Sequence, residues 1–338
     1  MSAPLPSSPR DVLGRPLRDL RLSVIEACNF RCPYCMPAEQ VPDDYGLDAA
    51  RRLSFDQIET LVRGFAALGV RKLRLTGGEP LLRKRLPALI ARLAAIPGIE
   101  DLALTTNGSL LAAQARALRE AGLRRLTVSL DTLDPAQFRA LSGGRGELAP
   151  VLAGLDAARA AGFAPIKLNC VVQRGVNEEA IEAIADYARR HGDVARYIEY
   201  MDVGTCNGWR RERVVPSAEV RDRIAARWPL LPLDPNYRGE VATRYGYRDG
   251  AGEVGFVSSV SAPFCGDCHR ARVSADGRLY TCLFAADGHD LRPALAAGAE
   301  ALAAHVAALW ARRADRYSEI RSQAGASRRH VEMFLIGG

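Results

Sequence analysis

The sequence predicts an α/β protein whose main unit is a partial (βα)6 barrel of the TIM type, followed by a second module. Three observations support this fold class. Short apolar strands alternate with helical segments six times between residues 19 and 205. Polar, glycine and cysteine residues gather directly after these strands, and the alternation stops beyond about residue 205. Alternating strands and helices favour right-handed βαβ units and a parallel sheet, and six repeats favour a barrel that does not close fully.

Each predicted strand is a short run of alternating or continuous apolar residues that ends at a polar or glycine-rich turn. In chain order the strands cover residues 19–25, 72–76, 101–106, 125–130, 165–172 and 196–201. A cysteine-rich loop follows the first strand, and Gly77-Gly78-Glu79-Pro80 follows the second. Because parallel strands present their carboxyl ends on one edge of the sheet, we expect the functional site on that edge.

The helices between these strands begin and end at local signals. Ser54 and Gln57 form the S-x-x-Q pattern of a capping box, which opens a helix that Gly69 can stop. Asp134-Pro135 opens a short helix, because proline suits the first helical turn. The remaining helices are predicted up to residue 96 and over residues 110–121, 148–161 and 178–190.

The segment from residue 206 to residue 338 is predicted to be a second module. Its short strands are expected at residues 241–247, 254–259, 272–274 and 278–281, and an alanine-rich helix is expected at residues 291–313. These strands surround a second group of cysteines. We therefore expect a loose leader over residues 1–18, a barrel over residues 19–205 and a C-terminal module over residues 206–338.

The composition indicates a cytoplasmic globular protein. The chain has 338 residues, of which 48% are hydrophobic and 25% charged, so it can bury a core without help from a metal. The net charge of +7 fits a polyanionic small substrate. The sequence lacks a run of five like charges, a signal peptide and a long apolar span, which argues against a nucleic-acid surface and a membrane. Clustered cysteines in such a protein indicate metal rather than disulfides.

Cys28, Cys32 and Cys35 lie within one loop at C-x-x-x-C-x-x-C spacing. Three thiolates can hold three corners of a [4Fe–4S] cluster and leave one iron open to a substrate-like ligand. A zinc knuckle would need a fourth ligand, and the closest downstream histidine is His191. Three buried free thiols are the other alternative. The spacing favours the iron–sulfur cluster.

Cys265, Cys268 and Cys282 form the second group, at C-x-x-C-x13-C spacing. A Cys3His zinc site with His269 or His289 is an alternative here. Two features favour a second cluster: the thiol count stops again at three, and two arginines at positions 270 and 272 follow Cys268. Guanidinium groups next to an open iron would suit an anionic ligand.

Two further cysteines remain. Cys170 lies in an apolar strand, where packing in the core is the expected role. Cys206 lies in a loop near the barrel mouth and is expected to be incidental. A charged residue in an apolar strand is harder to explain as structure, because a buried ammonium needs a partner; Lys167 is such a residue.

Together these motifs resemble a known family. The cysteine loop is similar to that of the radical S-adenosylmethionine superfamily, and the wider pattern resembles the GTP 3′,8-cyclase family of molybdenum cofactor biosynthesis. The resemblance rests on Arg21-Leu22-Ser23, Cys28-Asn29-Phe30-Arg31-Cys32, Thr76-Gly77-Gly78-Glu79-Pro80, Leu104-Thr105-Thr106-Asn107-Gly108, Val128-Ser129-Leu130-Asp131, Glu199-Tyr200-Met201-Asp202-Val203-Gly204, the second cysteine group and the final Gly337-Gly338. It extends from about residue 16 to the last residue.

The resemblance implies a lyase that uses two [4Fe–4S] clusters, held by the six clustered cysteines, and S-adenosylmethionine. A 5′-deoxyadenosyl radical would abstract the 3′ hydrogen of GTP, and the carbon radical would attack C8 of guanine to give 3′,8-cyclo-7,8-dihydro-GTP. By similarity, S-adenosylmethionine contacts are Tyr34, Gly78, Ser129 and Met201. GTP contacts are Arg21, Arg74, Thr105, Lys167, Arg270 and Arg272. The residues assigned to catalysis are Arg21, Arg270, Arg272, Gly337 and Gly338.

Partners follow from the same resemblance. An electron donor and the next enzyme of the molybdopterin pathway are implied, and the protein is expected to be a monomer or a homodimer. One departure concerns His269, where the family usually has asparagine; the histidine could donate a hydrogen bond near guanine or ligate the cluster. The Gly337-Gly338 tail is either a frayed terminus or a thin strand that enters the active site.

Two competing functions remain at this stage. One is a different radical S-adenosylmethionine enzyme with an auxiliary cluster, which would act on a peptide or a small metabolite. The other is a basic zinc-binding adaptor that recognises RNA or DNA. Consumption of GTP with formation of 5′-deoxyadenosine would separate the first from the cyclase. Metal analysis would separate the second, because two [4Fe–4S] clusters contain about eight irons and no zinc.

Overall fold

The computed structural model describes residues 8–46, 49–321 and 330–337. Within these residues, one sheet of twelve strands runs through the molecule in the order β12-β11-β10-β1-β2-β3-β4-β5-β6-β9-β8-β7. The strands are β1 (Asp19–Ser23), β2 (Lys72–Thr76), β3 (Asp101–Thr106), β4 (Arg125–Ser129), β5 (Lys167–Val172), β6 (Val194–Glu199), β7 (Leu230–Leu233), β8 (Thr243–Tyr247), β9 (Glu253–Val257), β10 (Arg270–Val273), β11 (Arg278–Tyr280) and β12 (His289–Asp290).

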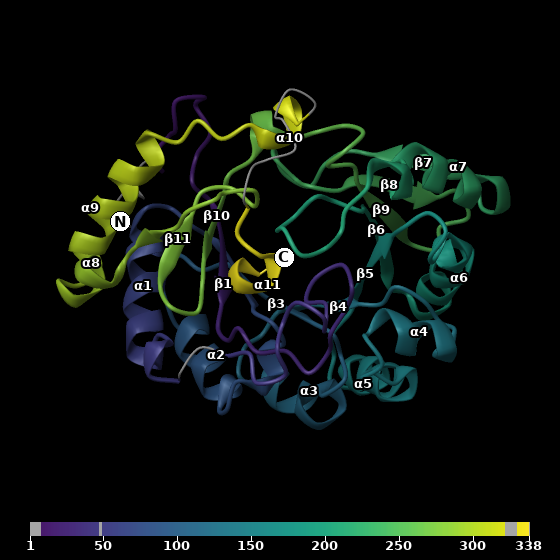
Figure 1. Ribbon diagram of the computed structural model, residues 1–338, viewed down its shortest axis with the longest axis horizontal. Coiled ribbons are helices and arrows are strands. Elements are labelled where there is room, and N and C mark those ends of the chain that lie inside the picture. Colours follow the sequence, from purple (N-terminus) through teal and green to yellow (C-terminus); the bar gives the residue numbers. More distant parts are fainter. Residues whose placement is uncertain (1–7, 47–48, 322–329, 338) are drawn as a thin grey trace.

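The middle of the sheet is parallel and curved like an incomplete barrel. Strands β1 to β6 pair in chain order, as the six-fold alternation predicts. A strand from the C-terminal third then extends the parallel sheet on each side: β10 pairs with β1, and β9 pairs with β6. Antiparallel strands complete both ends. The α/β class and the partial barrel are thus confirmed (Figure 1).

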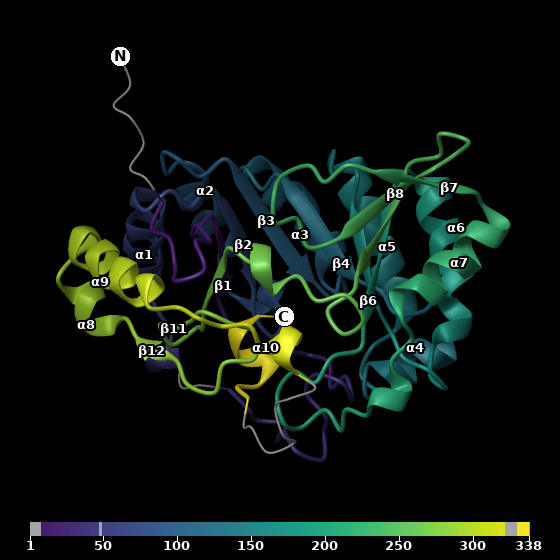
Figure 2. The ribbon, with the colours of Figure 1, turned by 90° about the horizontal axis from the view of Figure 1, so that it is seen from above.

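Helices α1 to α6 form an outer layer around the convex face of the sheet, whereas α11 lies inside the curve, as Figure 1 and the view from above in Figure 2 show. The helices are α1 (Phe55–Ala67), α2 (Leu86–Ala94), α3 (Leu111–Glu120), α4 (Pro135–Leu141), α5 (Leu148–Ala160), α6 (Ile181–His191), α7 (Ser217–Arg227), α8 (Arg292–Ala296), α9 (Ala299–Ala311), α10 (Tyr317–Ile320) and α11 (Met333–Ile336). The capping box of α1 is confirmed, since Ser54 and Gln57 bond each other's backbone N–H groups. Helix α9 packs closely on α1, where Gly64 leaves room for Leu302.

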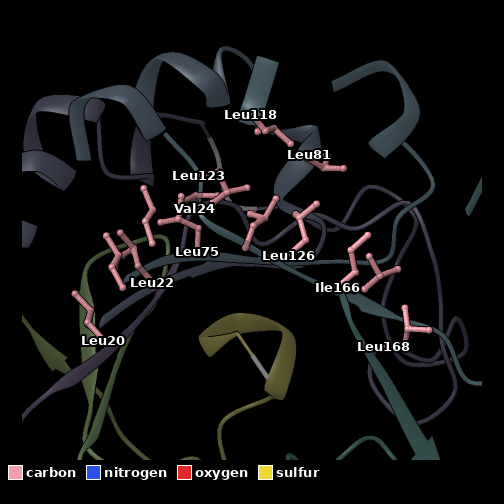
Figure 3. Packing of buried hydrophobic residues seen from close by; sticks show 14 of the residues in the cluster. Leu20, Leu22, Val24, Leu75, Leu81, Leu118, Leu123, Leu126, Ile166 and Leu168 are labelled. Atoms are coloured by element: carbon pink, nitrogen blue, oxygen red, sulfur yellow. The ribbon is translucent and has the colours of Figure 1, made fainter. Parts of the chain in front are cut away.

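The main core lies between the sheet and these helices. Leu20 and Leu22 of β1, Leu75 of β2 and Leu126 of β4 have exposures of 0–1%. Figure 3 shows such side chains pointing from the strands toward the helices, whereas α11 lies on the opposite, concave side of the sheet. Alternation along each strand therefore directs the polar residues of the same strands toward the inside of the barrel.

Several elements differ from the sequence-based expectation. The predicted helix over residues 291–313 is two helices, because Gly298 adopts a φ of 102° that ends the first one. Helix α7 was not predicted, and β6 begins and ends two residues earlier than expected. The described part of the leader is not loose: Leu17 is 0% and Arg15 is 2% exposed. None of the helices in the described part of the chain has the length and apolar character of a membrane span.

Candidate active site

A cavity lies on the concave side of the sheet, and basic side chains dominate its wall. The lining includes all six predicted GTP contacts, which come from the barrel strands and β10, and the three thiols of the second cysteine group; these residues are Arg21, Arg74, Thr105, Lys167, Arg270, Arg272, Cys265, Cys268 and Cys282. Other residues of the lining are Lys72, Asn169, Arg196 and Met201. The residues thus converge from strands that are far apart in the sequence.

Three arginines form a row across neighbouring strands. Arg21 of β1 is directly opposite Arg272 of β10 on one side and Arg74 of β2 on the other. Two residues earlier in β1, Asp19 is opposite Arg270 of β10 on one side and Lys72 of β2 on the other. Like charges that face each other across a sheet are destabilising. A row of this kind is therefore difficult to explain by stability and fits an anion that binds between the strands.

The electrostatics of the row agree with this. Burial, together with the charges of Arg270 and Arg74, lowers the pKa of Arg21 to about 9. Burial and the charge of Arg196 lower the pKa of Arg74 to about 10. The pKa of Arg272 falls as well, because it is buried and lies near two other arginines. The cavity therefore holds more positive charge than its acidic residues neutralise, and a polyanion would relieve this repulsion.

Lys167 is the most strongly perturbed amine of the wall. Burial, followed by the charges of Arg196 and Arg125, lowers its pKa to about 7. Glu240 is the one carboxylate among the main influences on this pKa, and its effect is weaker than those of burial and the three arginines. Arg74 is held differently: its Nη1 donates to Thr105 Oγ1 at 2.9 Å and to Thr127 Oγ1 at 3.0 Å. Thr105 therefore orients Arg74 as well as lining the cavity.

The second cysteine group lies in a positive environment. Cys268 accepts a hydrogen bond from Arg270 Nη2 at 3.5 Å. Burial disfavours the thiolate of Cys268, but Arg270 and Arg313 outweigh burial and lower its pKa to about 6. Cys282, in contrast, has a pKa of about 12 because it is buried and lies near Asp315. All three thiols line the same cavity, so they can face one common ligand.

The first cysteine group lies at the carboxyl edge of the barrel, where β1 ends. The Gly77-Gly78 turn after β2 supports it: Gly78 N–H donates to Ile25 O at 2.8 Å, and Glu79 N–H donates to Ala27 O at 2.8 Å. A Cβ atom on Gly78 would lie 2.3 Å from Ala27 O. Glycine is required because the two backbone segments touch here. Asn107 adds a contact, with its Nδ2 4.0 Å from the Cys28 sulfur.

The predicted contacts of S-adenosylmethionine lie around the same edge. Tyr34 OH donates to Asp131 Oδ2 at 2.7 Å, which ties the cysteine loop to the end of β4. Burial raises the pKa of Asp131 to about 6. Ser129 is the last residue of β4, Gly78 follows β2, and Met201 lies two residues beyond β6. The structure brings these four residues to the strand ends, as topology predicts.

Both cysteine groups suit the chemistry of an iron–sulfur cluster. Burial and the neighbouring thiols of Cys35 and Cys28 raise the pKa of Cys32. Thiolates so placed need positive charge nearby, and the irons of a cluster supply it. Across residues 8–46, 49–321 and 330–337, no three His, Cys, Asp or Glu side chains are arranged to ligate a single metal ion. Three thiolates that bind three different irons of a cluster do not need to meet at one point.

The two histidines considered as zinc ligands, and the two cysteines outside the groups, each have a different environment. The ring of His269 is 6% exposed and packs against Gly239 and Tyr237, and neither ring nitrogen has a hydrogen-bond partner in the described chain. His289 lies on the exposed strand β12. Cys170 is a fully buried core residue, as expected. Cys206 makes a specific contact that the sequence did not predict: its thiol donates to Glu332 Oε2 at 2.9 Å.

The C-terminal tail enters the cavity region. Arg272 Nη1 donates to Gly337 O at 2.6 Å, and a Cβ on Gly337 would lie 2.0 Å from Thr76 Cγ2. Phe334 packs with Met36, Val41 and Cys206 beside the first cysteine group. Figure 1 shows α11 and the end of the chain inside the curve of the sheet. Gly338 lies outside the described residues.

Some residues of the wall were missed by the sequence analysis. Lys72 and Arg196 face the cavity, and both could have been found, since they share a strand face with Arg74 and with the inward side of β6. Arg15 and Arg313 also line the cavity. They lie in a loop and at the end of α9, where no periodicity signals an inward side chain.

The partial barrel and its cysteine loop define a protein of the radical S-adenosylmethionine class. A family model described as the radical SAM superfamily matches residues 22–188. A second model, described as Molybdenum Cofactor Synthesis C, matches residues 194–319. The first match runs from the end of β1 through β5 and α6 to residue 188, and the second covers β6 and most of the C-terminal segment.

Similar curated proteins narrow this superfamily to one family. GTP 3′,8-cyclase of Xanthomonas campestris pv. campestris (strain 8004) is 70% identical over 329 residues, which are 97% of each chain. GTP 3′,8-cyclase of Acidothermus cellulolyticus is 52% identical, with 97% of this chain and 99% of the relative covered. The chain belongs to the GTP 3′,8-cyclase family.

A solved structure supports the fold alone. SuiB of Streptococcus suis, in a crystal structure with bound S-adenosylmethionine, superposes with a TM-score of 0.54 at 15% identity. The match covers 79% of this chain and 58% of SuiB. At this identity the likeness concerns the partial barrel and carries no information about the substrate.

Proposed function

We propose that the cavity between the two cysteine groups binds GTP and converts it to 3′,8-cyclo-7,8-dihydro-GTP, the reaction for which the family is named. The observation that carries this proposal is the row of Arg272, Arg21 and Arg74 on three neighbouring strands. A nucleoside triphosphate carries about four negative charges, and arginine can bind phosphate through two parallel hydrogen bonds. Membership in the family supports the same substrate.

The triphosphate binds to the barrel side of the cavity in this proposal. Arg21, Arg74 and Lys167 supply charge there, together with Lys72 and Arg196, which line the same wall. Their mutual repulsion in the free protein favours binding, because the anion restores the charge balance that the fold lacks. Thr105 holds the guanidinium of Arg74 in place.

The first cysteine group would hold a [4Fe–4S] cluster through Cys28, Cys32 and Cys35. When bound, this cluster and S-adenosylmethionine supply the 5′-deoxyadenosyl radical that the reaction needs. The protein residues Tyr34, Gly78, Ser129 and Met201 position S-adenosylmethionine at the strand ends. Gly78 does so through its backbone, which the absence of a Cβ leaves close to the cysteine loop.

The second cysteine group would hold another [4Fe–4S] cluster through Cys265, Cys268 and Cys282. Arg270 and Arg272 lie beside it in the cavity wall, and Arg272 is also the end of the arginine row that binds the phosphates. In this proposal residues 206–338 form a module that carries this cluster and closes the barrel mouth over the substrate. Gly337 and Gly338 complete the site from the tail, and Arg272 fixes the tail through Gly337.

An electron donor and the enzyme that consumes the cyclic nucleotide are the remaining partners that this function requires. The decisive experiment is anaerobic reconstitution with iron and sulfide, followed by incubation with GTP, S-adenosylmethionine and a reductant. We expect 5′-deoxyadenosine and the cyclised nucleotide in equal amounts. Formation of 5′-deoxyadenosine without consumption of GTP would instead indicate another radical S-adenosylmethionine reaction.

A further inference from the structure

A buried set of charges joins the N-terminal segment to the second cysteine group. It consists of Asp11, Arg15 and Arg313, which we call the arginine clamp; their exposures are 6%, 2% and 4%. Asp11 Oδ2 accepts from Arg15 Nε at 2.6 Å and from Arg313 Nη1 at 3.0 Å. One carboxylate thus holds two guanidinium groups from opposite ends of the chain.

The two arginines direct their other donors at the backbone of the second cysteine group. Arg15 Nη1 donates to Cys265 O at 2.7 Å. Arg313 Nη1 donates to Cys268 O at 2.7 Å, and its Nε donates to Thr281 O, next to Cys282, at 3.0 Å. Each of the three thiol positions is therefore fixed through a carbonyl oxygen at or beside the cysteine itself.

Packing makes the clamp rigid. The Arg313 guanidinium lies 4.5 Å from the centre of the Trp310 ring, and Trp310 Nε1 donates to Arg15 O at 3.0 Å. Arg15 N–H also donates to Asp11 Oδ1 at 2.9 Å. Buried ion pairs contribute little net stability, because desolvation offsets their attraction, but they can specify one geometry. Arg15 and Arg313 bond the backbone at or beside all three cysteines, so the geometry that the clamp specifies is that of the second cysteine group.

One donor of the clamp is unused. Arg15 Nη2 is buried and has no hydrogen-bond partner in the chain as described. Arg15 and Arg313 both line the cavity with Cys265, Cys268 and Cys282. An unsatisfied buried donor is costly, so a partner is expected in the functional state. The sulfurs of an iron–sulfur cluster are negatively charged acceptors that would suit it.

We propose that the arginine clamp positions the second cysteine group for its cluster and that Arg15 makes the reduction potential of this cluster more positive. The inference rests on the proposed function, because the second cluster is part of that proposal. A hydrogen bond and a fixed positive charge near the sulfurs stabilise the reduced, more negative form of a cluster. Asp11, Arg15 and Arg313 are positioning residues in this scheme and do not touch the substrate.

The test compares Arg15→Gln and Arg15→Lys with the parent protein after anaerobic reconstitution. Iron and sulfide are counted, and both clusters are titrated potentiometrically and followed by electron paramagnetic resonance, so that the first cluster serves as an internal reference. For Arg15→Gln we expect about four irons per chain in place of about eight, or a second cluster with a more negative potential. Arg15→Lys keeps the charge and should retain more of the second cluster.

A control variant breaks an ion pair elsewhere that joins a partly exposed arginine to a buried carboxylate. Arg159 on α5 bonds Asp193, which is 3% exposed, at 2.6 Å, far from both cysteine groups in the sheet order. Arg159→Gln should leave both clusters unchanged. A second cluster with normal iron content and normal potential in Arg15→Gln would overturn the clamp proposal, as would its equal loss in Arg159→Gln. About four irons in the parent protein would instead overturn the second cluster itself, and the clamp with it.

Discussion

Arg272 donates a hydrogen bond to the carbonyl oxygen of Gly337, at 2.6 Å, and so fixes the C-terminal tail against strand β10. The tail reaches this position because Gly337 has no side chain: a Cβ there would lie 2.0 Å from Thr76 Cγ2. Its φ of 66° also favours glycine. Met333 of the same segment lines the cavity, so the tail forms part of its wall.

Deletion of residues 337–338 should abolish cyclisation and leave both clusters intact. The tail contacts Arg272 and Thr76 at the cavity, whereas it supplies no thiol. Formation of the cyclic nucleotide and the iron content of the purified protein check this. Unchanged cyclase activity in the truncated protein would contradict the role of the tail.

Substitutions in the two cysteine groups should have different effects on cluster content and activity. Cys28→Ala should remove the first cluster and with it all formation of 5′-deoxyadenosine. Cys265→Ala should keep the spectrum of the first cluster but lose cyclisation of GTP, because only the second group lines the cavity with Arg270 and Arg272. Product analysis and electron paramagnetic resonance distinguish the two variants. Full turnover by either one would argue against the scheme.

Lys167 should make GTP binding depend on pH. Its pKa of about 7 lies far below the usual value, so the ammonium loses its proton as pH rises through 7 to 8. The triphosphate favours the charged form, and binding above pH 7 must therefore take up a proton. We expect the dissociation constant to rise by up to about tenfold per pH unit in this range. Calorimetry in buffers of different ionisation enthalpy measures the proton uptake.

Two variants at the same position provide the control. Lys167→Arg keeps its charge at these pH values and should flatten the profile relative to the parent protein with the same nucleotide. Lys167→Met should weaken binding by roughly 10- to 100-fold at pH 7, as expected for the loss of one charged hydrogen bond. A parent profile that parallels Lys167→Arg would show that Lys167 does not titrate on binding.

Gly78→Ala should prevent assembly of the first cluster. The added methyl group would lie 2.3 Å from Ala27 O, and the backbone bond from Gly78 N–H to Ile25 O could not form at 2.8 Å. About half of the iron should be lost. Gly46→Ala is the matched control, because its Cβ would meet no atom closer than 3.6 Å. Equal iron content in both variants would be evidence against support of the cysteine loop by the Gly77-Gly78 turn.

Local patterns predicted the barrel strands well. The six strands and their parallel order followed from alternating apolar segments, and the capping box at Ser54 located the start of α1. The same patterns placed the cysteine loop, Gly78 and Ser129 at one edge. The alternation of side chains along the strands could also have predicted two further residues of the cavity wall, because Lys72 and Arg196 lie on the inward faces of their strands.

Other features have no local signature. The pairing of β10 with β1 and of β9 with β6 joins segments that are distant in the chain. The residues of β9 and β10 contain no pattern that identifies the strand with which each one pairs. Arg15 lies in a short loop with proline and glycine neighbours, which predicts exposure. Its burial results from Asp11 and Arg313, and the position of Arg313 depends on how α9 packs. Such contacts exist only once the tertiary structure has formed.

The parallel pairing of β10 with β1 has a consequence for synthesis of the chain. Arg15, just before β1, and Cys265, just before β10, are 250 residues apart. At roughly 5–20 residues per second, translation of this interval takes on the order of tens of seconds. During that time β1 presents an uncovered edge to which other chains could add. Early folding of this protein therefore depends on what shields that edge on the ribosome, and the cavity can form only when most of the chain has emerged.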